Sequence, residues 1–304
     1  MTDTPPPTLC GEVAVIGAPN AGKSTLVNAL VGAKVAIVSA KVQTTRTRLI
    51  GIAIEGRAQM LLVDTPGIFA PKRRLDRAMV KAAWTGAQGA DVIVLVIDAK
   101  RGTRNEEVEA ILAGLEADTT TPKLLVLNKV DICPKERLLS LTAELSARLP
   151  FQQIFMVSAE TGDGVADLKQ TLAAMMPESP WHYPEDQVAD VTQRLMAAEI
   201  TREKIYHQLH DELPYAAAVD TEKWEERRDG SAAIHQVIYV ERETQKPIVV
   251  GAKGTRIKAL GEAARADMEA QLGRRIHLFL HVKVKPNWAE DRSVYREIGL
   301  DWVE

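Results

Sequence analysis

The stretch EVAVIGAPNAGKSTLVNALVG, residues 12–32, joins an apolar, β-branched run to a helical pattern through a glycine-rich loop. The loop fits the pattern G-x-x-x-x-G-K-[ST], with Gly17, Gly22, Lys23 and Ser24 at the fixed positions. Glycines let the backbone wrap a phosphate chain, and the N–H groups at the start of the helix form a cradle for anions. We therefore expect a strand, a loop and a helix that together bind nucleotide phosphates.

Each position of this loop has an expected role toward a nucleotide. Lys23 is expected to reach the β- and γ-phosphates, and the Ser24 hydroxyl is expected to ligate Mg²⁺. The residues expected to line the phosphate site are Gly17, Ala18, Pro19, Asn20, Ala21, Gly22, Lys23, Ser24 and Thr25.

A second motif, QMLLVDTPGI at 59–68, ends a buried-strand pattern in an acid. An acid at the C-terminal end of a strand lies where ligands bind in open α/β sheets. Asp64 can hold Mg²⁺ through a water molecule and the Gly67 N–H can meet a γ-phosphate, with Thr65 and Pro66 between them. Alone, D-T-P-G indicates only a turn; after a phosphate loop and a strand it predicts the metal and switch motif.

A third motif, KLLVLNKVD at 123–131, is another apolar strand pattern that ends in Asn128, Lys129 and Asp131. The Asp131 carboxylate can accept hydrogen bonds from N1–H and the amino group of guanine. Adenine offers no such donor pair and would leave the carboxylate unpaired. The Asn128 amide is expected to brace the pocket and the Lys129 stem to cover the face of the base. We therefore predict GTP, not ATP, as the substrate.

A fourth motif, IFMVSAETGDG at 154–164, places Ser158 and Ala159 at a strand tip, where their N–H groups are expected to meet guanine O6. Strand-like runs alternate with helical patterns along this half of the chain, and they lie at 12–16, 48–54, 59–64, 91–97, 123–127 and 154–157. This alternation predicts an α/β fold with a doubly wound, mostly parallel sheet. The four motifs together resemble the P-loop GTPase domain of the translation-factor-like GTPases.

Two features bear on hydrolysis. The segment KVQTTRTR at 41–48 contains Thr45, with Thr44 as its near neighbour. We expect Thr45 to complete the Mg²⁺ shell only when a γ-phosphate is present. The alternative is that this segment is a solvated loop. Ile68 follows Gly67, where Ras-type enzymes place a glutamine that orients the attacking water. A hydrophobic side chain cannot orient water, so intrinsic hydrolysis is expected to be slow or to need another device.

Asn20 inside the phosphate loop has two interpretations, and the residues alone leave them even. Its amide oxygen can ligate a monovalent cation such as K⁺ beside the β- and γ-phosphates, supplying the electrostatic stabilisation of an arginine finger. Asparagine is equally a common turn residue. The residues expected to take part in catalysis are Lys23, Thr45, Gly67 and Asn20.

Composition bounds the class of protein. The chain of 304 residues has a net charge of −3, 46% hydrophobic residues and two cysteines, which are too few for a disulfide framework or a metal cluster. No apolar run reaches the length of a membrane-spanning helix, and MTDTPPPTLC at 1–10 is unlike a secretion signal. We expect a cytoplasmic monomer. Aromatic residues make up only 5%, which argues against a surface for stacking bases.

The second half of the chain predicts a smaller α+β domain. The expected divisions are a nucleotide domain at 8–176, a linker with three prolines at 177–187 and a second domain at 188–304. The second domain shows a long amphipathic helix, strand-like segments at 215–226 and 233–241, an apolar run at 248–250, a turn at 251–254, a helix at about 255–272 and a strand at 276–284. This order is that of a KH RNA-binding domain of the prokaryotic type.

The turn GAKG in this domain is the expected RNA clamp, because GxxG loops of KH domains hold a single-stranded backbone. Residues 246–285 carry nine Lys and Arg against three acids, a local charge of +6 in an acidic chain. The residues expected to bind RNA are Gly251, Lys253, Gly254, Arg256, Lys258, Ile248 and Ile257, with Val249 and Leu260 completing an apolar groove.

The segments GAPNAGKST, QTTR, DTPGI, NKVD and SAE, followed by GAKG, resemble those of the bacterial Era GTPases over nearly the whole chain. The resemblance implies a GTPase that binds 16S rRNA near its 3′ end when loaded with GTP and assists assembly of the small (30S) ribosomal subunit. It also implies peripheral association with the inner membrane, which nothing in the composition shows. By the family's pattern, Thr45 lies in the effector loop and Asn20 lies where related GTPases bind potassium.

Two other interpretations compete. In one, the chain is a membrane-associated signalling switch whose second domain binds protein, and RNA cross-linking of residues 185–304 distinguishes it. In the other, it is an ATP-dependent kinase of the P-loop type, which Asp131 argues against and which competition between GTP and ATP tests.

Overall fold

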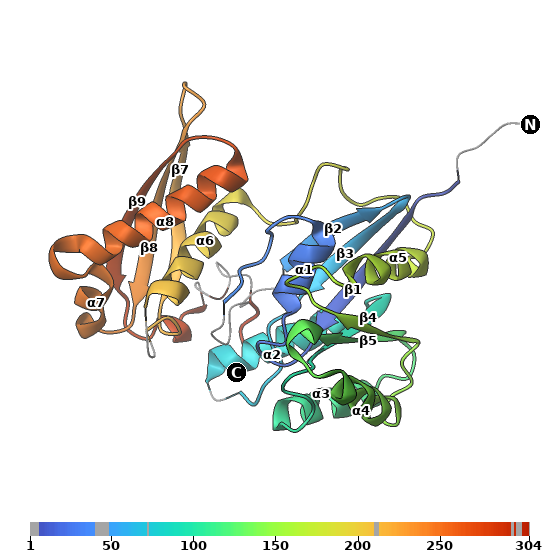
Figure 1. The fold of residues 1–304 in the computed structure, drawn as a ribbon. Coiled ribbons are helices and arrows are strands. Elements are labelled where there is room, and N and C mark those ends of the chain that lie inside the picture. The colour runs from blue at the N-terminus through green and yellow to red at the C-terminus, as the bar shows by residue number, and fades with distance from the viewer. Residues whose placement is uncertain are drawn as a thin grey trace, which may run out of the picture. The chain divides into compact units, whose positions relative to one another are not determined.

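The computed structural model describes residues 6–39, 49–71, 73–209, 213–292, 295 and 300–303. By their contacts the residues form two compact units, one of residues 1–36, 45–190 and 303–304 and the other of residues 37–44 and 191–302. Each unit has its own sheet (Figure 1) and its own apolar core.

The first unit is built on a six-stranded sheet in the order β2-β3-β1-β4-β5-β6. β2 runs antiparallel to β3, and the other neighbouring pairs are parallel. The strands are β1 (Leu9–Ile16), β2 (Leu49–Glu55), β3 (Ala58–Asp64), β4 (Val92–Asp98), β5 (Lys123–Asn128) and β6 (Gln153–Val157). The predicted doubly wound, mostly parallel sheet is confirmed.

Helices cover both faces of this sheet, which explains why β3, β4 and β5 are buried along their whole length. The helices are α1 (Lys23–Val31), α2 (Arg74–Ala87), α3 (Glu106–Glu116), α4 (Lys135–Ser146) and α5 (Val165–Met175). α2, α3 and α4 share one apolar cluster with β4 and β5. α3 begins at a well-formed cap, since the Asn105 side chain accepts from Val108 N at 2.7 Å and three acids occupy the first turn.

The strand order reverses at β1, because β3 lies on one side of it and β4 on the other. In open parallel sheets ligands bind outside the carboxyl ends of the strands at such a reversal. The loops that follow β1, β3, β4, β5 and β6 therefore converge on one edge, and four of them carry the motifs found in the sequence.

The proline-containing segment expected to be a linker is held against the first unit. Cys10 N donates to Pro177 O at 3.0 Å, and the Gln59 side chain bonds to the main chain of Tyr183. Ile52 N donates to Val188 O at 2.8 Å, so the contacts of this unit extend to residue 190.

The second unit carries a three-stranded sheet in the order β7-β8-β9, with β7 antiparallel and β9 parallel to the central β8. Its elements are α6 (Gln193–Gln208), β7 (Ala218–Glu226), β8 (Ala232–Val240), α7 (Lys246–Val250), α8 (Thr255–Leu272) and β9 (Ile276–Val284). α6 and α8 pack on one face of the sheet (Figure 1), where Ala198, Ile238, Leu260 and Val282 form a buried core. The predicted α+β domain of the KH type is confirmed.

One local difference from the sequence pattern affects the site. The apolar run 248–250 belongs to the short helix α7, which starts beside Pro247 because proline suits the first helical turn. No helix among the described residues combines the length and hydropathy needed to span a bilayer.

Candidate functional site

The phosphate loop (residues 17–25) holds its lysine in place. Lys23 is 7% exposed, and its ammonium donates to the main-chain oxygens of Gly17 and Ala18, both at 3.1 Å. Burial lowers the pKa of this amino group to about 8, although the nearby Asp64 carboxylate acts in the opposite direction. The amine is thus held over the loop by hydrogen bonds to neutral carbonyl oxygens. Phosphate oxygens can take the place of these acceptors, and the hydrogen bonds are then stronger because the phosphate is negatively charged.

Two glycines bring the motifs together. Gly22 has a left-handed backbone (φ 95°), and a Cβ on it would lie 2.2 Å from Asn128 Nδ2. A Cβ on Gly67 would lie 2.9 Å from the main-chain nitrogen of Pro19. Only glycine fits either position, so the phosphate loop packs directly against the DTPG and NKVD motifs.

The predicted metal ligands lie next to each other. The Ser24 hydroxyl donates to Asp64 Oδ2 at 2.8 Å, and Asp64 is fully buried at the end of β3. Thr65 is also fully buried and donates to Val15 O at 2.9 Å, so its hydroxyl fixes the end of β3 to β1. Thr45 and Thr44 lie outside the described residues.

The residue after Gly67 is part of the apolar core. Ile68 is 3% exposed and packs in the cluster that contains Ala18. Its N–H donates to Gly17 O at 3.3 Å. The side chain is therefore turned away from solvent as well as chemically unable to orient water.

The NKVD motif braces the phosphate loop. Asn128 Nδ2 donates to Ala21 O at 2.9 Å, and Asn128 Oδ1 accepts from Ala159 N at 3.0 Å. One side chain thus joins the loops after β1, β5 and β6. Ser158 N donates to Asp163 O at 3.0 Å, so both N–H groups expected to meet guanine O6 are engaged within the protein, and that contact stays a prediction.

Lys129 forms a second bridge to the phosphate loop. Its backbone is left-handed (φ 66°), and its ammonium donates to Asn20 O at 2.7 Å and to Asp98 Oδ2 at 2.8 Å. Asn20 is also left-handed (φ 62°), a conformation that asparagine tolerates, so the turn role is filled. Asp131 is exposed and makes no hydrogen bond or ion pair with the described residues, which leaves its carboxylate available to a base.

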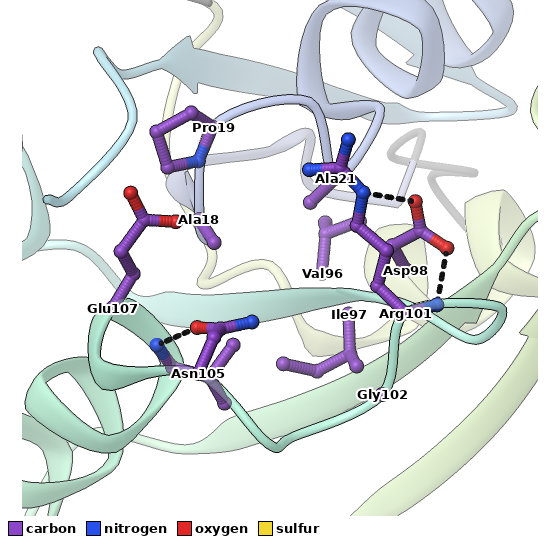
Figure 2. Close-up of a pocket in the computed structure, with 11 residues that line it drawn as sticks. Ala18, Pro19, Ala21, Val96, Ile97, Asp98, Arg101, Gly102, Asn105 and Glu107 are labelled. Atoms are coloured by element: carbon purple, nitrogen blue, oxygen red, sulfur yellow. Dashed lines mark hydrogen bonds and ion pairs between the residues drawn. The ribbon is translucent and has the colours of Figure 1, made fainter.

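Asp98 is a residue of this site that the sequence analysis missed. It ends β4 and is 8% exposed, and its other oxygen accepts from the main-chain N–H groups of Lys100 and Arg101. Figure 2 shows it in a recess between the phosphate loop and the start of α3, with Arg101 beside it and Glu107 facing Pro19. The rule that identified Asp64, an acid at the end of a buried strand, applies equally to Asp98 and would have found it.

The GAKG turn (residues 251–254) forms the start of α8. Gly251, Lys253 and Gly254 all have positive φ values, of 75°, 51° and 78°. A Cβ on Gly251 would lie 2.7 Å from Arg256 Cβ, whereas a Cβ on Gly254 would meet nothing within 4 Å. The turn is therefore tight on the Gly251 side and open on the Gly254 side.

The positive charge of this unit is divided into two groups. Arg274, Lys283 and Lys285 form ion pairs with Glu226, Glu222 and Asp291. Lys253 and Lys258 are exposed and form no ion pair with the described residues. Unpaired positive charge therefore lies at the GAKG turn and the first turn of α8, as it does at other exposed basic residues of this unit such as Arg265 and Arg275. Arg256, also exposed there, donates to Ile248 O at 2.7 Å and so secures the end of α7.

The apolar groove differs in part from the prediction. Ile248 is 48% exposed and Ile257 is partly buried, but Val249 and Leu260 are fully buried. Placing Val249 and Leu260 in the groove was wrong, because each lies on the face of its helix that packs into the core. On β9, Leu280 is partly buried and faces α8, where a Cβ on Gly261 would approach it to 3.4 Å.

Known proteins resemble both units and their combination. The family described as "50S ribosome-binding GTPase" matches residues 12–129, and the KH domain family matches residues 212–289. GTPase Era of Erythrobacter litoralis (strain HTCC2594) is 59% identical over 298 residues, which are 97% of each chain. GTPase Era of Brucella suis biovar 1 is 58% identical over 97% of this chain and 94% of its own.

A solved structure shares the whole architecture. The crystal structure of Era in complex with MgGDPNP and nucleotides 1506–1542 of 16S ribosomal RNA superimposes with a TM-score of 0.90 at 38% identity, covering 96% of this chain and 99% of that one. A single-residue variant of Aquifex aeolicus Era bound to GDP and AlF4⁻ gives the same TM-score, identity and coverage.

Proposed function

This chain belongs to the Era family of GTPases, and from that premise we propose that GTP binding and hydrolysis control its binding of 16S rRNA near the 3′ end during assembly of the small ribosomal subunit. The observation that carries the proposal is the combination of two anion sites in one chain. A closed guanine-nucleotide site lies in the first unit, and an open, positively charged glycine loop lies in the second.

In the nucleotide site, Lys23 binds the β- and γ-phosphates and Asp131 selects guanine, while Asn128 and Lys129 hold the base loop against the phosphate loop. Ser24 and Asp64 supply hard oxygen ligands of the kind that Mg²⁺ prefers, so the residues present fit this ion. Mg²⁺ bound there neutralises charge on the phosphate oxygens. Thr45 would be a further oxygen ligand of this ion in the GTP state.

Hydrolysis needs a substitute for a water-orienting side chain, since Ile68 is apolar and buried. We assign part of that role to a monovalent cation held by the Asn20 amide oxygen, which places positive charge beside the bridging oxygen. The left-handed backbone of Asn20 is compatible with this role and with a plain turn.

The RNA contact is proposed for the GAKG turn and the adjoining groove. Gly251 and Gly254 let the RNA backbone approach closely, while Lys253 and Lys258 pair with phosphates. Ile248 and Ile257, together with Leu280, receive the bases, and Arg256 adds charge from the rim.

The nucleotide state can reach this unit through the residues that follow α1. Residues 37–39 belong by their contacts to the second unit, where Val38 N donates to Glu203 Oε1 at 3.2 Å. The Val38 carbonyl lies 3.1 Å from His207 Nε2. Glu203 and His207 are on α6, so Val38 is hydrogen-bonded within the RNA-binding unit.

The matching family description and the matching solved structure name different parts of the ribosome. The description that matches residues 12–129 names the 50S particle, whereas the relative that carries 16S rRNA matches over 96% of this chain, including the KH domain. The RNA-binding unit lies outside the first match, so we favour the small subunit as the partner. We also propose domain boundaries at 8–176, 177–187 and 188–304, and a cytoplasmic monomer that associates peripherally with the inner membrane.

The test is to identify RNA that co-purifies with the full chain loaded with GDPNP and, separately, with GDP. The proposal expects enrichment of the 3′ end of 16S rRNA in the GDPNP sample. Enrichment of 23S rRNA would favour the large subunit, and the absence of any RNA would contradict the proposal.

A further inference from the structure

One aromatic side chain of the second unit is exposed on the face of the sheet opposite α6 and α8. Phe279 in β9 is 47% exposed. Its neighbours Leu278 and Leu280 pack into the clusters formed with α6 and α8. Because side chains alternate along a strand, Phe279 points to the opposite face of the sheet.

Phe279 is already arranged as a flat stacking surface. His235 lies directly across from it on β8, and the two rings stack with their centroids 4.6 Å apart and their planes 16° apart. An exposed ring held parallel to a neighbour loses little conformational freedom when a third ring stacks on it. The low aromatic content of the chain predicted no such surface, so this pair is a local exception.

Basic and acidic groups lie around the stack in ion pairs, and Glu225 Oε2 also lies 3.7 Å from His235 Nε2. Lys223 pairs with Glu225 at 2.8 Å, and Lys283 pairs with Glu222 at 2.6 Å, all on partly or largely exposed side chains. Exposed ion pairs contribute little free energy, so phosphates can compete for these ammonium groups. The surface thus combines ring faces with exchangeable cations, which is the chemistry that binds single-stranded nucleic acid.

The position of β9 links this surface to the GAKG groove. β9 is an edge strand of the described sheet, with Leu280 facing α8 and Phe279 on the other side. Leu280 and Phe279 are adjacent residues on opposite faces of this edge strand. A single-stranded RNA that passes around the edge of β9 would therefore meet the Phe279–His235 pair. We propose that this pair is a second RNA contact, a stacking platform for a single-stranded base next to the nucleotides held by the GAKG turn. The inference rests on the proposed RNA binding.

The experiment measures binding of fluorescein-labelled RNA to the full chain loaded with GDPNP. The probes are the 16S rRNA fragment 1506–1542, the shortest piece of it that still binds, and that piece extended by about five nucleotides on either side. KH loops clamp about four nucleotides, so the shortest piece occupies the groove alone. Phe279→Ala is expected to weaken binding of the extended RNAs about tenfold and to leave the shortest piece within about twofold.

Matched variants separate stacking from structure. Phe279→Trp is expected to retain full affinity, whereas Phe279→Leu, which keeps an apolar side chain without a ring face, should behave like Phe279→Ala. Irradiation of the complex is expected to cross-link RNA to the peptide that contains Phe279. GTP hydrolysis without RNA should be unchanged in all three variants.

Several outcomes overturn the inference. They are equal affinity of Phe279→Ala and the parent chain for extended RNAs, equal losses for long and short RNAs, or a change in oligomeric state on substitution, which would assign the surface to a second copy. These results leave the proposed function intact if the parent chain binds RNA and Gly254→Asp does not. If the parent chain binds none of the probes, both proposals fail.

Discussion

The molecule uses a glycine loop with a lysine twice, and the two loops differ in how enclosed they are. Gly22 and Gly254 both have left-handed backbones and both begin a helix. Lys23 is 7% exposed and bonded to two carbonyls, whereas Lys253 is exposed. The closed loop suits one ligand in one geometry, while the open loop suits a polymer backbone of varied sequence.

The sharpest way to test this contrast is the same substitution in both loops. Gly22→Ala places a Cβ 2.2 Å from Asn128 Nδ2, while Gly254→Ala places one where no atom lies within 4 Å. We expect Gly22→Ala to weaken GTP binding at least about a hundredfold, about 2.7 kcal/mol. Gly254→Ala should lower the free energy of unfolding by only about 1 kcal/mol, because alanine is less stable than glycine in a left-handed backbone, and it should change RNA affinity less than about tenfold. Calorimetry measures GTP affinity and fluorescence anisotropy measures RNA affinity. If each variant loses a similar factor of affinity for its ligand, the two loops do not differ in how enclosed they are.

Base selection in the closed site depends on Asp131, whose carboxylate is exposed and available to guanine. Asp131→Asn turns a pair of acceptors into one donor and one acceptor, so GTP affinity should fall about a hundredfold and xanthosine triphosphate should become the better ligand. Competition binding with GTP, XTP and ATP measures the change. Unchanged preference for GTP would show that another group reads the base.

RNA binding at the open GAKG loop depends on the charge around it. Gly254→Asp puts a carboxylate beside the path of the RNA phosphates and should weaken RNA binding by more than about tenfold, 1.4 kcal/mol. GTP affinity should not change, because the phosphate loop and the GAKG turn belong to different units. Gly254→Asn is the control of similar shape without charge and is expected to keep most of the affinity. If Gly254→Asp keeps it as well, the clamp lies elsewhere.

The pH dependence of stability and of GTP binding gives a smaller test of the closed loop. The folded pKa of Lys23, about 8, lies below its ordinary value because the amine is buried. The unfolded chain therefore binds more protons above pH 8, and the free energy of unfolding should rise from there toward pH 10.5. Phosphate favours the ammonium form, so GTP binding should take up about half a proton at pH 8 and weaken about tenfold by pH 9. Calorimetry in two buffers of different ionisation enthalpy measures the uptake, and none at pH 8 would contradict the assignment.

The sequence predicted these loops well where the information is local. The spacing of Gly17, Gly22 and Lys23 is a property of one loop and needs no knowledge of the rest of the fold. The bridge from Lys129 to Asp98 was not predictable in the same way, because it depends on β5 lying beside β4.

The direction in which a side chain points from its helix or strand was the other feature that the sequence did not predict. Val249 and Leu260 were placed in the groove because they are apolar and lie near the GAKG turn, but a helix turns adjacent residues by about 100° and directs these two into the core. Phe279 escaped notice because only the pairing of β8 with β9 sets it against His235. Pairing between distant segments is what a single sequence does not state.

The smallest expected effect concerns Asn20, which distinguishes a filled turn from a cation site. The charge that builds on the oxygen between the β- and γ-phosphates needs a nearby positive group, and Ile68 supplies neither charge nor water. We expect KCl to accelerate single-turnover GTP hydrolysis several-fold over matched NaCl, because the larger ion fits an amide and phosphate ligand set. Asn20→Ala should lose this response and keep its affinity for GTP within a few-fold, since the main-chain oxygen of residue 20 still accepts from Lys129. Asn20→Asp keeps an oxygen ligand and should keep part of the response. Equal rates in both salts, with and without RNA, would leave Asn20 as the residue that forms the turn, and the closed loop would then stabilise the transition state through Lys23 and Mg²⁺ alone.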